Sequence, residues 1–404
     1  MLVMKGSAVS NVESTVIGPK TAVLPSGQEV TVISPTITTP YQHLPTTSQQ
    51  EFNQASQLSS IEEDLAQILS SSGAWKPFLS SSSPNFRQIV SVMLQSRANS
   101  TTKAYLRVIK RFLEWCRSRE LSVRLPFPVS TVSLYLFENH QSCASSASLV
   151  QAHAALKWFH SFVPSLDRNP LDSEFCKNLI ESAKRIKSKP IAKKKPFSSQ
   201  IIKDILDAYN KEDANLKDVR IAALCSLAFA GFFRYNELCN ISPNHIEFHS
   251  QYIKIFVPRS KTDVYREGNY VYISASGTSY CPVSVLRRYM NLGGIHDKSD
   301  LPLFRPLVFH RSNSSYTLRD GKISYTTCRE ILRDSLKHLG FNPDEYGLHS
   351  LRSGGITSVV RHSGNSVSER LLKLHGRWKT DAAKDMYVEE SLDNRLQVTK
   401  FLGL

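Results

Sequence analysis

Several short segments in the second half of the chain carry side chains suited to phosphate chemistry. In residues 231–238 an apolar stretch ends at Arg234, and a carboxylate, Glu237, follows three residues later. An arginine presents a planar fork that matches phosphate oxygens, and a carboxylate can hold that fork in orientation. Taken alone, an arginine and a glutamate at this spacing more often form a structural ion pair. The pair gains a functional meaning only together with the segments that follow.

A lysine, a histidine and a second arginine add candidates for proton transfer and phosphate binding. Lys261 lies in the polar connection between two expected strands, where most lysines have no special role but some reach a leaving oxygen. His349 and Arg352 are three residues apart, so on a helix both project to one face. An imidazole can move protons near neutral pH, and a guanidinium can neutralise a phosphate. Gly354 and Gly355, just after them, would let backbones approach closely.

A tryptophan and a tyrosine near the end of the printed sequence complete the set. Trp378 and Tyr387 are nine residues apart, and a turn and a helix are expected between them. An indole N–H never ionises and suits a nonbridging phosphate oxygen, while a deprotonated phenol is an adequate nucleophile. Each residue alone is more often a core aromatic. Together and in this order, they indicate a site for phosphoryl transfer.

The order of these basic and aromatic residues resembles the catalytic set of the tyrosine recombinases, or phage-integrase family. The segments Gly-Phe-Phe-Arg, Ser-Lys-Thr-Asp, His-Ser-Leu-Arg-Ser-Gly-Gly and Gly-Arg-Trp-Lys are similar to those of eukaryotic transposon-borne members, particularly of Crypton and DIRS-type elements. The resemblance spans residues 90–395. It is carried by Arg234, Lys261, His349, Arg352, Trp378 and Tyr387.

The resemblance implies strand exchange in DNA through a covalent intermediate, with no metal and no other cofactor. Tyr387 would attack a phosphodiester of double-stranded DNA, leaving a 3′-phosphotyrosyl bond and a free 5′-hydroxyl. Arg234, Arg352 and Trp378 would stabilise the charge on the pentacoordinate phosphate. Because the phosphotyrosyl bond preserves the bond energy, a 5′-hydroxyl from another strand can reverse the attack without ATP.

The same resemblance assigns the remaining roles. Lys261 would protonate the leaving 5′-oxygen, His349 would assist proton transfer and position the phosphate, and Glu237 would orient the first arginine. The family often has a histidine where this chain has Trp378, while His375 is out of register with the nucleophile and is expected to be structural.

The resemblance also implies a homo-oligomer, with a dimer on each DNA site and a tetramer in synapsis. Family members commonly pass a C-terminal segment to a neighbouring subunit. Phe401 and Leu402 are candidates for such an anchor.

The residues around the motifs predict a mainly α fold with a small β-hairpin or sheet, in which an N-terminal helical core-binding domain precedes a tyrosine-recombinase catalytic domain. Residues 252–257 and 270–273 are β-branched and aromatic and flank a turn that contains Gly268, so they predict a hairpin. Apolar residues at helical spacing predict helices in the first domain. These helices cover residues 99–119, 129–140, 148–162 and 173–188.

Two groups of basic residues are candidates for contact with DNA. One lies along the helix 99–119, where an ordinary solvated face is an equally good interpretation. The other lies in a proline-broken linker that could follow a DNA backbone, serve as a nuclear import signal or act as a plain hinge. The candidates are Lys103, Arg107, Lys110, Arg111, Lys193, Lys194 and Lys195.

Changes in composition divide the chain into four parts. Residues 1–85 are rich in Ser, Thr, Pro and Gln and are expected to be largely disordered, with a short helix around residues 61–69. Residues 86–186 form the helical DNA-binding domain, 187–196 the basic linker and 197–404 the catalytic domain.

The overall charge favours a polyanionic partner. The chain of 404 residues contains 50 Lys and Arg against 35 Asp and Glu, which gives a formal charge of +15. Neutralised phosphates release counterions, which favours nucleic acid, although charge alone does not exclude a membrane surface.

The longest apolar run, residues 221–233, is too short to span a bilayer. Seven scattered cysteines without a C-x-x-C pair predict buried thiols, and we expect an intracellular, nuclear protein with no metal site.

Three other functions compete with a recombinase. A type IB topoisomerase performs nearly the same chemistry on one duplex without synapsis. A domesticated DNA-binding protein would lack activity, and it often loses the nucleophile or an arginine, whereas this chain keeps all six residues. A metal-dependent transposase or nuclease needs clustered carboxylates, which are sparse near the basic motifs.

Overall fold

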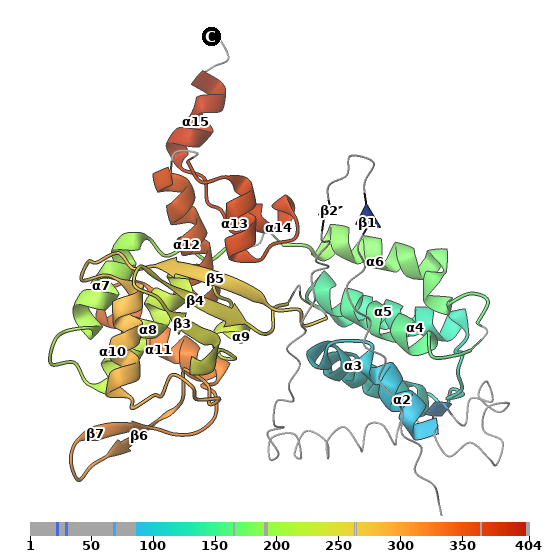
Figure 1. Ribbon diagram of the computed structural model, residues 1–404. Coiled ribbons are helices and arrows are strands. Elements are labelled where there is room, and N and C mark those ends of the chain that lie inside the picture. The colour runs from blue at the N-terminus through green and yellow to red at the C-terminus, as the bar shows by residue number, and fades with distance from the viewer. Residues whose placement is uncertain are drawn as a thin grey trace, which may run out of the picture. The chain divides into compact units, whose positions relative to one another are not determined.

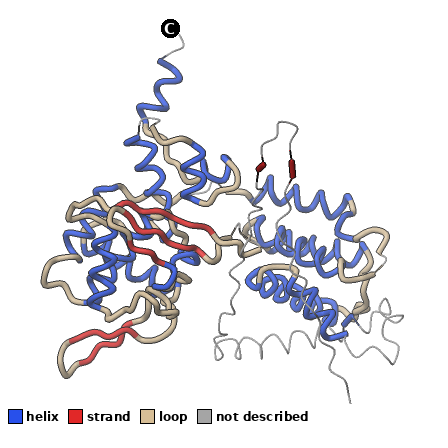
Figure 2. The backbone as a smooth tube through the Cα atoms, viewed as in Figure 1, coloured by secondary structure: helices blue, strands red, loops and turns tan. Residues whose placement is uncertain are grey.

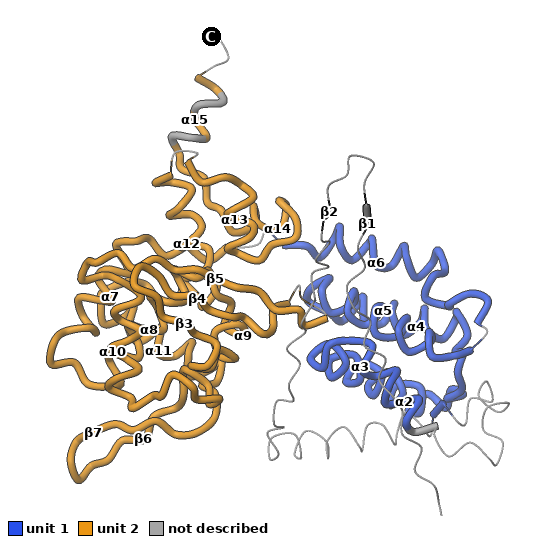
Figure 3. Tube along the Cα trace, in the orientation of Figure 1, with its two compact units in different colours: residues 1–190 blue, residues 191–404 orange. Residues whose placement is uncertain are grey.

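A computed structural model describes the chain at residues 22–23, 29–30, 68–69, 86–164, 166–189, 193–261, 263, 265–363 and 366–400. The chain divides into two compact units, residues 1–190 and 191–404 (Figure 3). The division falls inside the stretch that the sequence suggests as a linker. The predicted helix at residues 61–69 and the predicted disorder of residues 1–85 fall almost entirely outside the described residues, as do Phe401 and Leu402.

The first unit is helical over residues 86–189, as the sequence predicts (Figures 1 and 2). Each predicted helix is present within a few residues of its expected limits. One more helix, α2, precedes them, and two short strands pair near the N-terminus. The elements are β1 (Ala22–Val23), β2 (Glu29–Val30), α2 (Phe86–Gln95), α3 (Asn99–Ser118), α4 (Val129–Ser142), α5 (Ser146–His160), the 3₁₀ turn η2 (Pro170–Asp172) and α6 (Glu174–Lys187).

Aromatic side chains fill the core of the first unit. Phe112 of α3 is fully buried and meets Phe127 and Tyr135 edge to face, with ring centres 4.8 and 5.0 Å apart. Such pairs favour one geometry beyond the burial of their area. The core leaves Arg107, Lys110 and Arg111 on the exposed side of α3, since apolar residues at helical spacing occupy the other side.

The second unit combines helices with two small antiparallel sheets (Figure 1). Its helices are α7 (Ser199–Tyr209), α8 (Leu216–Ala230), α9 (Tyr235–Leu238), α10 (Pro282–Leu292), α11 (Tyr325–His338), α12 (Leu348–Ser363), α13 (Glu369–Gly376), α14 (Asp381–Asp385) and α15 (Leu392–Lys400), with 3₁₀ turns η3 (Pro243–His245) and η4 (Pro343–Glu345). Its strands are β3 (Ile246–Phe248), β4 (Tyr252–Val257), β5 (Asn269–Ser274), β6 (Leu307–His310) and β7 (Ser315–Leu318).

The predicted hairpin is confirmed as strands β4 and β5, which pair antiparallel from Tyr252 opposite Ser274 to Val257 opposite Asn269. Alternate residues of β4 are buried, as the period of a strand requires. The sequence analysis missed β3, which pairs with β4, and the hairpin β6–β7. Both are too short, or too exposed, to show a clear alternation of apolar residues.

Helix α8 lies at the centre of the second unit. Residues on every side of this helix are buried, so the apolar run of residues 221–233 lies in the core. Among the described residues, no helix has the length and apolarity needed to cross a membrane. Because α8 is fixed on all sides by α7, α10 and α12, its C-terminal end is a rigid base for the turn that carries Arg234.

Candidate active site

Arg234 and Glu237 are positioned by the tight turn that follows α8. The helix ends at Gly231, Phe232 takes a left-handed φ of 47°, and Arg234 becomes the N-cap of α9. Glu237, three residues on, accepts hydrogen bonds from the Arg234 backbone N–H at 3.0 Å and from its guanidinium Nη1 at 2.6 Å. This is the pair that the sequence indicates, and the Glu237 carboxylate satisfies the free backbone N–H of Arg234 at the start of α9.

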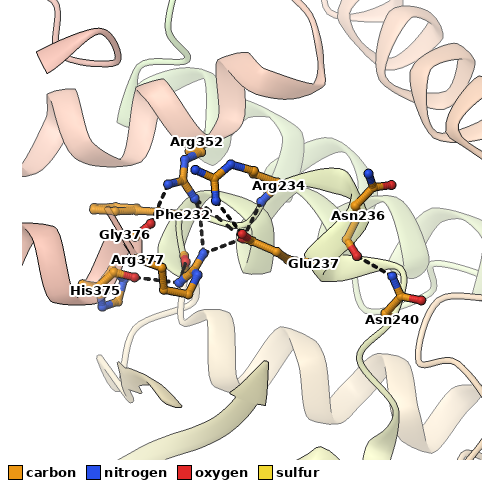
Figure 4. Close-up of polar contacts among 10 residues, drawn as sticks. Phe232, Arg234, Asn236, Glu237, Asn240, Arg352, His375, Gly376 and Arg377 are labelled. Atoms are coloured by element: carbon orange, nitrogen blue, oxygen red, sulfur yellow. Dashed lines mark hydrogen bonds and ion pairs between the residues drawn. The ribbon is translucent and has the colours of Figure 1, made fainter. Parts of the chain in front are cut away.

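The carboxylate of Glu237 is the centre of a buried ionic cluster (Figure 4). Its side chain is 1% exposed and lies between three guanidinium groups, with Arg377 Nη2 at 2.7 Å and Arg352 Nη1 at 3.6 Å. Burial by itself raises the pKa of Glu237, but Arg377, Arg352 and Arg234 outweigh burial and lower it. Three cations around one anion leave a surplus of positive charge, which a phosphate could balance.

Arg352 enters this cluster from the first turns of α12. It is 0% exposed, and its guanidinium donates to the backbone carbonyls of Phe232 and Gly376. Burial, followed by repulsion from Arg234, lowers the pKa of Arg352 to about 9. The group therefore remains cationic at neutral pH, but its charge lies in surroundings that a bound anion would stabilise.

Two glycines of α12 make this approach possible. A Cβ on Gly354 would lie 2.3 Å from the Phe197 carbonyl oxygen, and one on Gly355 would lie 2.3 Å from that of Phe229. Both distances are shorter than a van der Waals contact. The close approach of backbones that the sequence suggests is therefore present, and it brings α12 against the end of α8.

Trp378 and Tyr387 lie against Arg352. The Arg352 guanidinium carbon is 4.2 Å from the centre of the Trp378 ring and 5.0 Å from that of Tyr387, and the two rings are 5.5 Å apart. Trp378 is 6% exposed, and its Nε1 has no hydrogen-bond partner among the described residues. An unpaired buried N–H is costly, so a donor in this position is suited to an external acceptor.

Short elements hold the tyrosine in place. The indole of Trp378 covers the position where a Cβ on Gly376 would lie, 1.7 Å from the ring, so that only glycine fits at the end of α13. Tyr387 follows α14, its N–H donates to Lys384, and its carbonyl accepts from Thr357 of α12 at 3.3 Å. The phenol is partly exposed rather than enclosed in the core.

His349 lies one turn before Arg352 on α12, at the exposed border of the cluster. Desolvation, followed by the charges of Arg234, Arg352 and Lys261, lowers the pKa of His349 from 6.5, and Glu237 opposes them only in part. Lys261, which is exposed in the β4–β5 connection, thus contributes to the positive charge around the imidazole. The structure thus gathers all seven predicted residues around one region of the second unit.

The sequence analysis missed Arg377, which is as deeply buried as Glu237. The prediction for His375 fits its surroundings, since its ring bonds to the Ala230 carbonyl at 2.8 Å and packs on Phe232. Arg377 belongs to the Gly-Arg-Trp segment, but nothing in the sequence indicates that this arginine is buried. Only the structure shows its unusual backbone conformation, with a φ of 58°.

The predicted DNA-binding residues are scattered over both units and exposed, except that Lys103 is half-buried. In the second unit, Lys194 donates to the Asp344 carbonyl, and Lys195 pairs with Glu345 at 2.8 Å. Exposed ion pairs of this kind are weak, so these lysines can exchange their partners for phosphates. Lys193 is exposed beside them.

The cluster as a whole can bind a tetrahedral or pentacoordinate phosphate and present a phenol to it. Arg234, Arg352 and the Trp378 N–H are preorganised donors, and a preorganised donor does not have to reorganise when charge develops. The Tyr387 phenol lies beside these donors, and a phenol is a group that can act as a nucleophile once deprotonated.

Comparisons with known proteins found similar sequences and a similar fold. Residues 197–372 match the model of the phage integrase family. The integrase/recombinase xerD homolog of Selenomonas ruminantium is 25% identical over 299 residues, which cover 73% of this chain and 83% of that protein. The XerH site-specific recombinase bound to palindromic difH substrate, in a post-cleavage complex, has a TM-score of 0.51 at 13% identity, covering 74% of this chain and 79% of that one. Its likeness shows a shared fold.

Proposed function

We propose that the chain is a tyrosine recombinase of the phage integrase family, whose model residues 197–372 match, and that it cleaves and rejoins DNA with Tyr387 as nucleophile. The phenol oxygen attacks phosphorus and forms a 3′-phosphotyrosyl bond as the bond to the 5′-oxygen breaks. His349 assists removal of the phenolic proton, and Lys261 protonates the departing oxygen, which leaves as a 5′-hydroxyl. Rejoining reverses these steps with another 5′-hydroxyl.

The observation that carries this proposal is the placement of the phenol. The Tyr387 ring centre lies 5.0 Å from the guanidinium carbon of Arg352 and 5.5 Å from the Trp378 ring. A tyrosine on a cationic cluster can attack a phosphate that the cluster holds, since positioning alone supplies much of a rate enhancement. Arg234 and Arg352 neutralise the charge on the pentacoordinate phosphate, and Glu237 orients both.

The biological setting follows from the same proposal. Double-stranded DNA is the substrate, and the basic residues of α3 and of residues 193–195 contact its backbone. A dimer on each site and a tetramer in synapsis carry out the exchange. We place the protein in a mobile element of the Crypton or DIRS type, which its motifs resemble, and in the nucleus.

A suicide substrate tests the reaction. A nick just 3′ of the cleaved phosphate releases a short fragment, so the 5′-hydroxyl diffuses away and the covalent complex accumulates. We expect a protease-removable adduct at the 3′ end with the wild type and none with Tyr387→Phe, which retains the cluster and therefore the DNA affinity. An undiminished adduct in Tyr387→Phe would overturn the assignment.

The products separate the competing functions. Joint molecules between two duplexes identify a recombinase, whereas relaxation of supercoils without joint molecules identifies a topoisomerase. Salt-sensitive binding without any adduct identifies a DNA-binding protein that has lost its activity.

A further inference from the structure

Arg377 ends α13 in a conformation that arginine rarely adopts. Its φ and ψ are 58° and 42°, and its N–H donates to the Leu374 carbonyl in the manner of a helix C-cap. Glycine usually occupies this position, because the left-handed region is sterically unfavourable for a residue with a Cβ. A strained residue at such a position indicates that its side chain has a task there.

The side chain of Arg377 connects the two segments that build the ionic cluster. It donates from Nη2 to Glu237 at 2.7 Å and to the Phe232 carbonyl at 2.8 Å, and from Nη1 to Gly231 and His375 at 3.2 and 2.6 Å. The first three acceptors lie between α8 and the end of α9, whereas the arginine directly precedes Trp378 (Figure 4).

Arg377 shares its acceptors in the cluster with Arg352, whereas the Arg234 guanidinium bonds to the other oxygen of Glu237. Arg377 and Arg352 both bond to the Phe232 carbonyl, and both approach the same oxygen of Glu237, Oε2. The other carboxylate oxygen, Oε1, accepts from Arg234. The Arg377 side chain is 1% exposed, and Glu237 neutralises it inside the protein. Arg377 therefore stabilises the cluster from within the protein.

We propose that Arg377 is a positioning residue that fixes Glu237, and through it the guanidinium groups of Arg234 and Arg352, in the geometry that binds the phosphate. Arg377 acts through these groups and does not touch DNA. Its second effect is to tie the turn that carries Trp378 to the turn after α8, so that the indole N–H and the arginines keep one relative placement. This inference rests on the proposed function of the pocket.

Two variants distinguish the effect of the Arg377 side chain from the effect of its backbone conformation. Arg377→Asn keeps a residue that tolerates left-handed φ but removes the guanidinium, and Arg377→Lys keeps the charge without the fork. Since displacement by about 1 Å can cost about 100-fold, we expect single-turnover cleavage to slow by roughly 10- to 100-fold in Arg377→Asn at saturating DNA. DNA affinity should change by less than about threefold, because Arg377 touches no phosphate.

A neutral substrate distinguishes positioning from a general structural defect. A methylphosphonate at the cleaved position lacks one anionic oxygen, so it depends less on the arginines. For both variants we expect the ratio of wild-type rate to variant rate to be at least about fivefold smaller on this substrate than on the phosphodiester. The reason is that the neutral substrate needs less charge stabilisation. Arg288→Asn is the matched control, because Arg288 also binds backbone carbonyls, those of Asn210, Lys211 and Glu212, but far along the chain from the cluster.

Each outcome decides the question. Cleavage at the wild-type rate in both variants would overturn the inference, as would a loss of equal size on both substrates. If Arg377→Asn fails to fold, Arg377→Lys alone supplies the comparison between substrates. An absent adduct with the wild-type protein would instead remove the proposed function, and the inference with it, whereas unaffected variants of an active wild type overturn only the role of Arg377.

Discussion

The guanidinium of Arg352 lies 4.2 Å above the ring of Trp378, so the cation is held between an aromatic face and the carboxylate of Glu237. An indole is the strongest aromatic partner for a cation. The same tryptophan leaves its Nε1 unpaired among the described residues. One side chain thus has two features that bear on the proposed function, because its face contacts an arginine and its edge carries an unpaired donor.

Replacing Glu237 by glutamine should destabilise the unliganded protein. The change leaves three buried guanidinium groups without their anion, and uncompensated buried charge costs about 3–5 kcal/mol. We expect a clear fall in Tm, and we expect DNA to restore more stability to Glu237→Gln than to the wild type, since a phosphate supplies the missing charge. Thermal unfolding with and without DNA measures both effects.

Glu247→Gln is the control for that experiment. Glu247 pairs with Lys254 at the exposed surface of the sheet, where an ion pair contributes little. An equal fall in Tm for both variants would show that the cluster around Glu237 has no special cost.

Trp378→Phe should retain the packing of the ring but lose the indole donor. The loss of one preorganised donor slows a reaction by roughly 100- to 1000-fold, so we expect a fall of this order in single-turnover cleavage at saturating DNA. Trp378→His restores an N–H donor and should recover part of the rate despite its smaller ring. Equal rates for the two variants would show that only the ring face matters.

The helices of the first unit and the β4–β5 hairpin could be predicted because their patterns are local. Apolar residues recur along α3 at helical spacing, and β4 alternates. The hairpin β6–β7 could not, because none of its strand residues is buried and the strands carry little periodic signal. A short third strand, β3, depends on its neighbour β4 for its hydrogen bonds.

Most members of the cluster were predicted from their residue types and their order, but Arg377 and the contacts among the members were not. Arg377 is the clearest case, because its burial follows from the fold of α13 against the turn after α8. Sequence spacing links Glu237 to Arg234 but says nothing about a partner 140 positions away. Long-range pairing is a property of packing.

His349 should make DNA binding depend on pH. Desolvation and the nearby Arg234, Arg352 and Lys261 lower its pKa below 6.5 in the unliganded protein. A bound phosphate favours the protonated imidazole and raises that pKa again, so binding takes up a proton and affinity rises as pH falls. We expect the wild type to gain more affinity than His349→Asn between about pH 7.5 and 5.5, as measured by titration with labelled DNA. Parallel curves would contradict this prediction.

Gly355→Ala should destabilise the second unit. The added methyl group would lie 2.3 Å from the Phe229 carbonyl oxygen and 2.5 Å from the Phe232 ring, and a helix cannot move away from backbone as a flexible side chain can. Overpacking of this kind costs about 1–3 kcal/mol. Denaturant unfolding measures the cost, and Gly277→Ala is a control with open space but left-handed φ. An unchanged midpoint for Gly355→Ala would show that α12 and α8 can separate freely.

Mapping the covalent adduct tests the central assignment most directly. After trapping on a suicide substrate, digestion of the DNA and protein leaves a peptide that carries a nucleotide, and mass spectrometry locates it. The account predicts the modification on Tyr387 alone. A nucleotide on another tyrosine, or on any other residue, would contradict it.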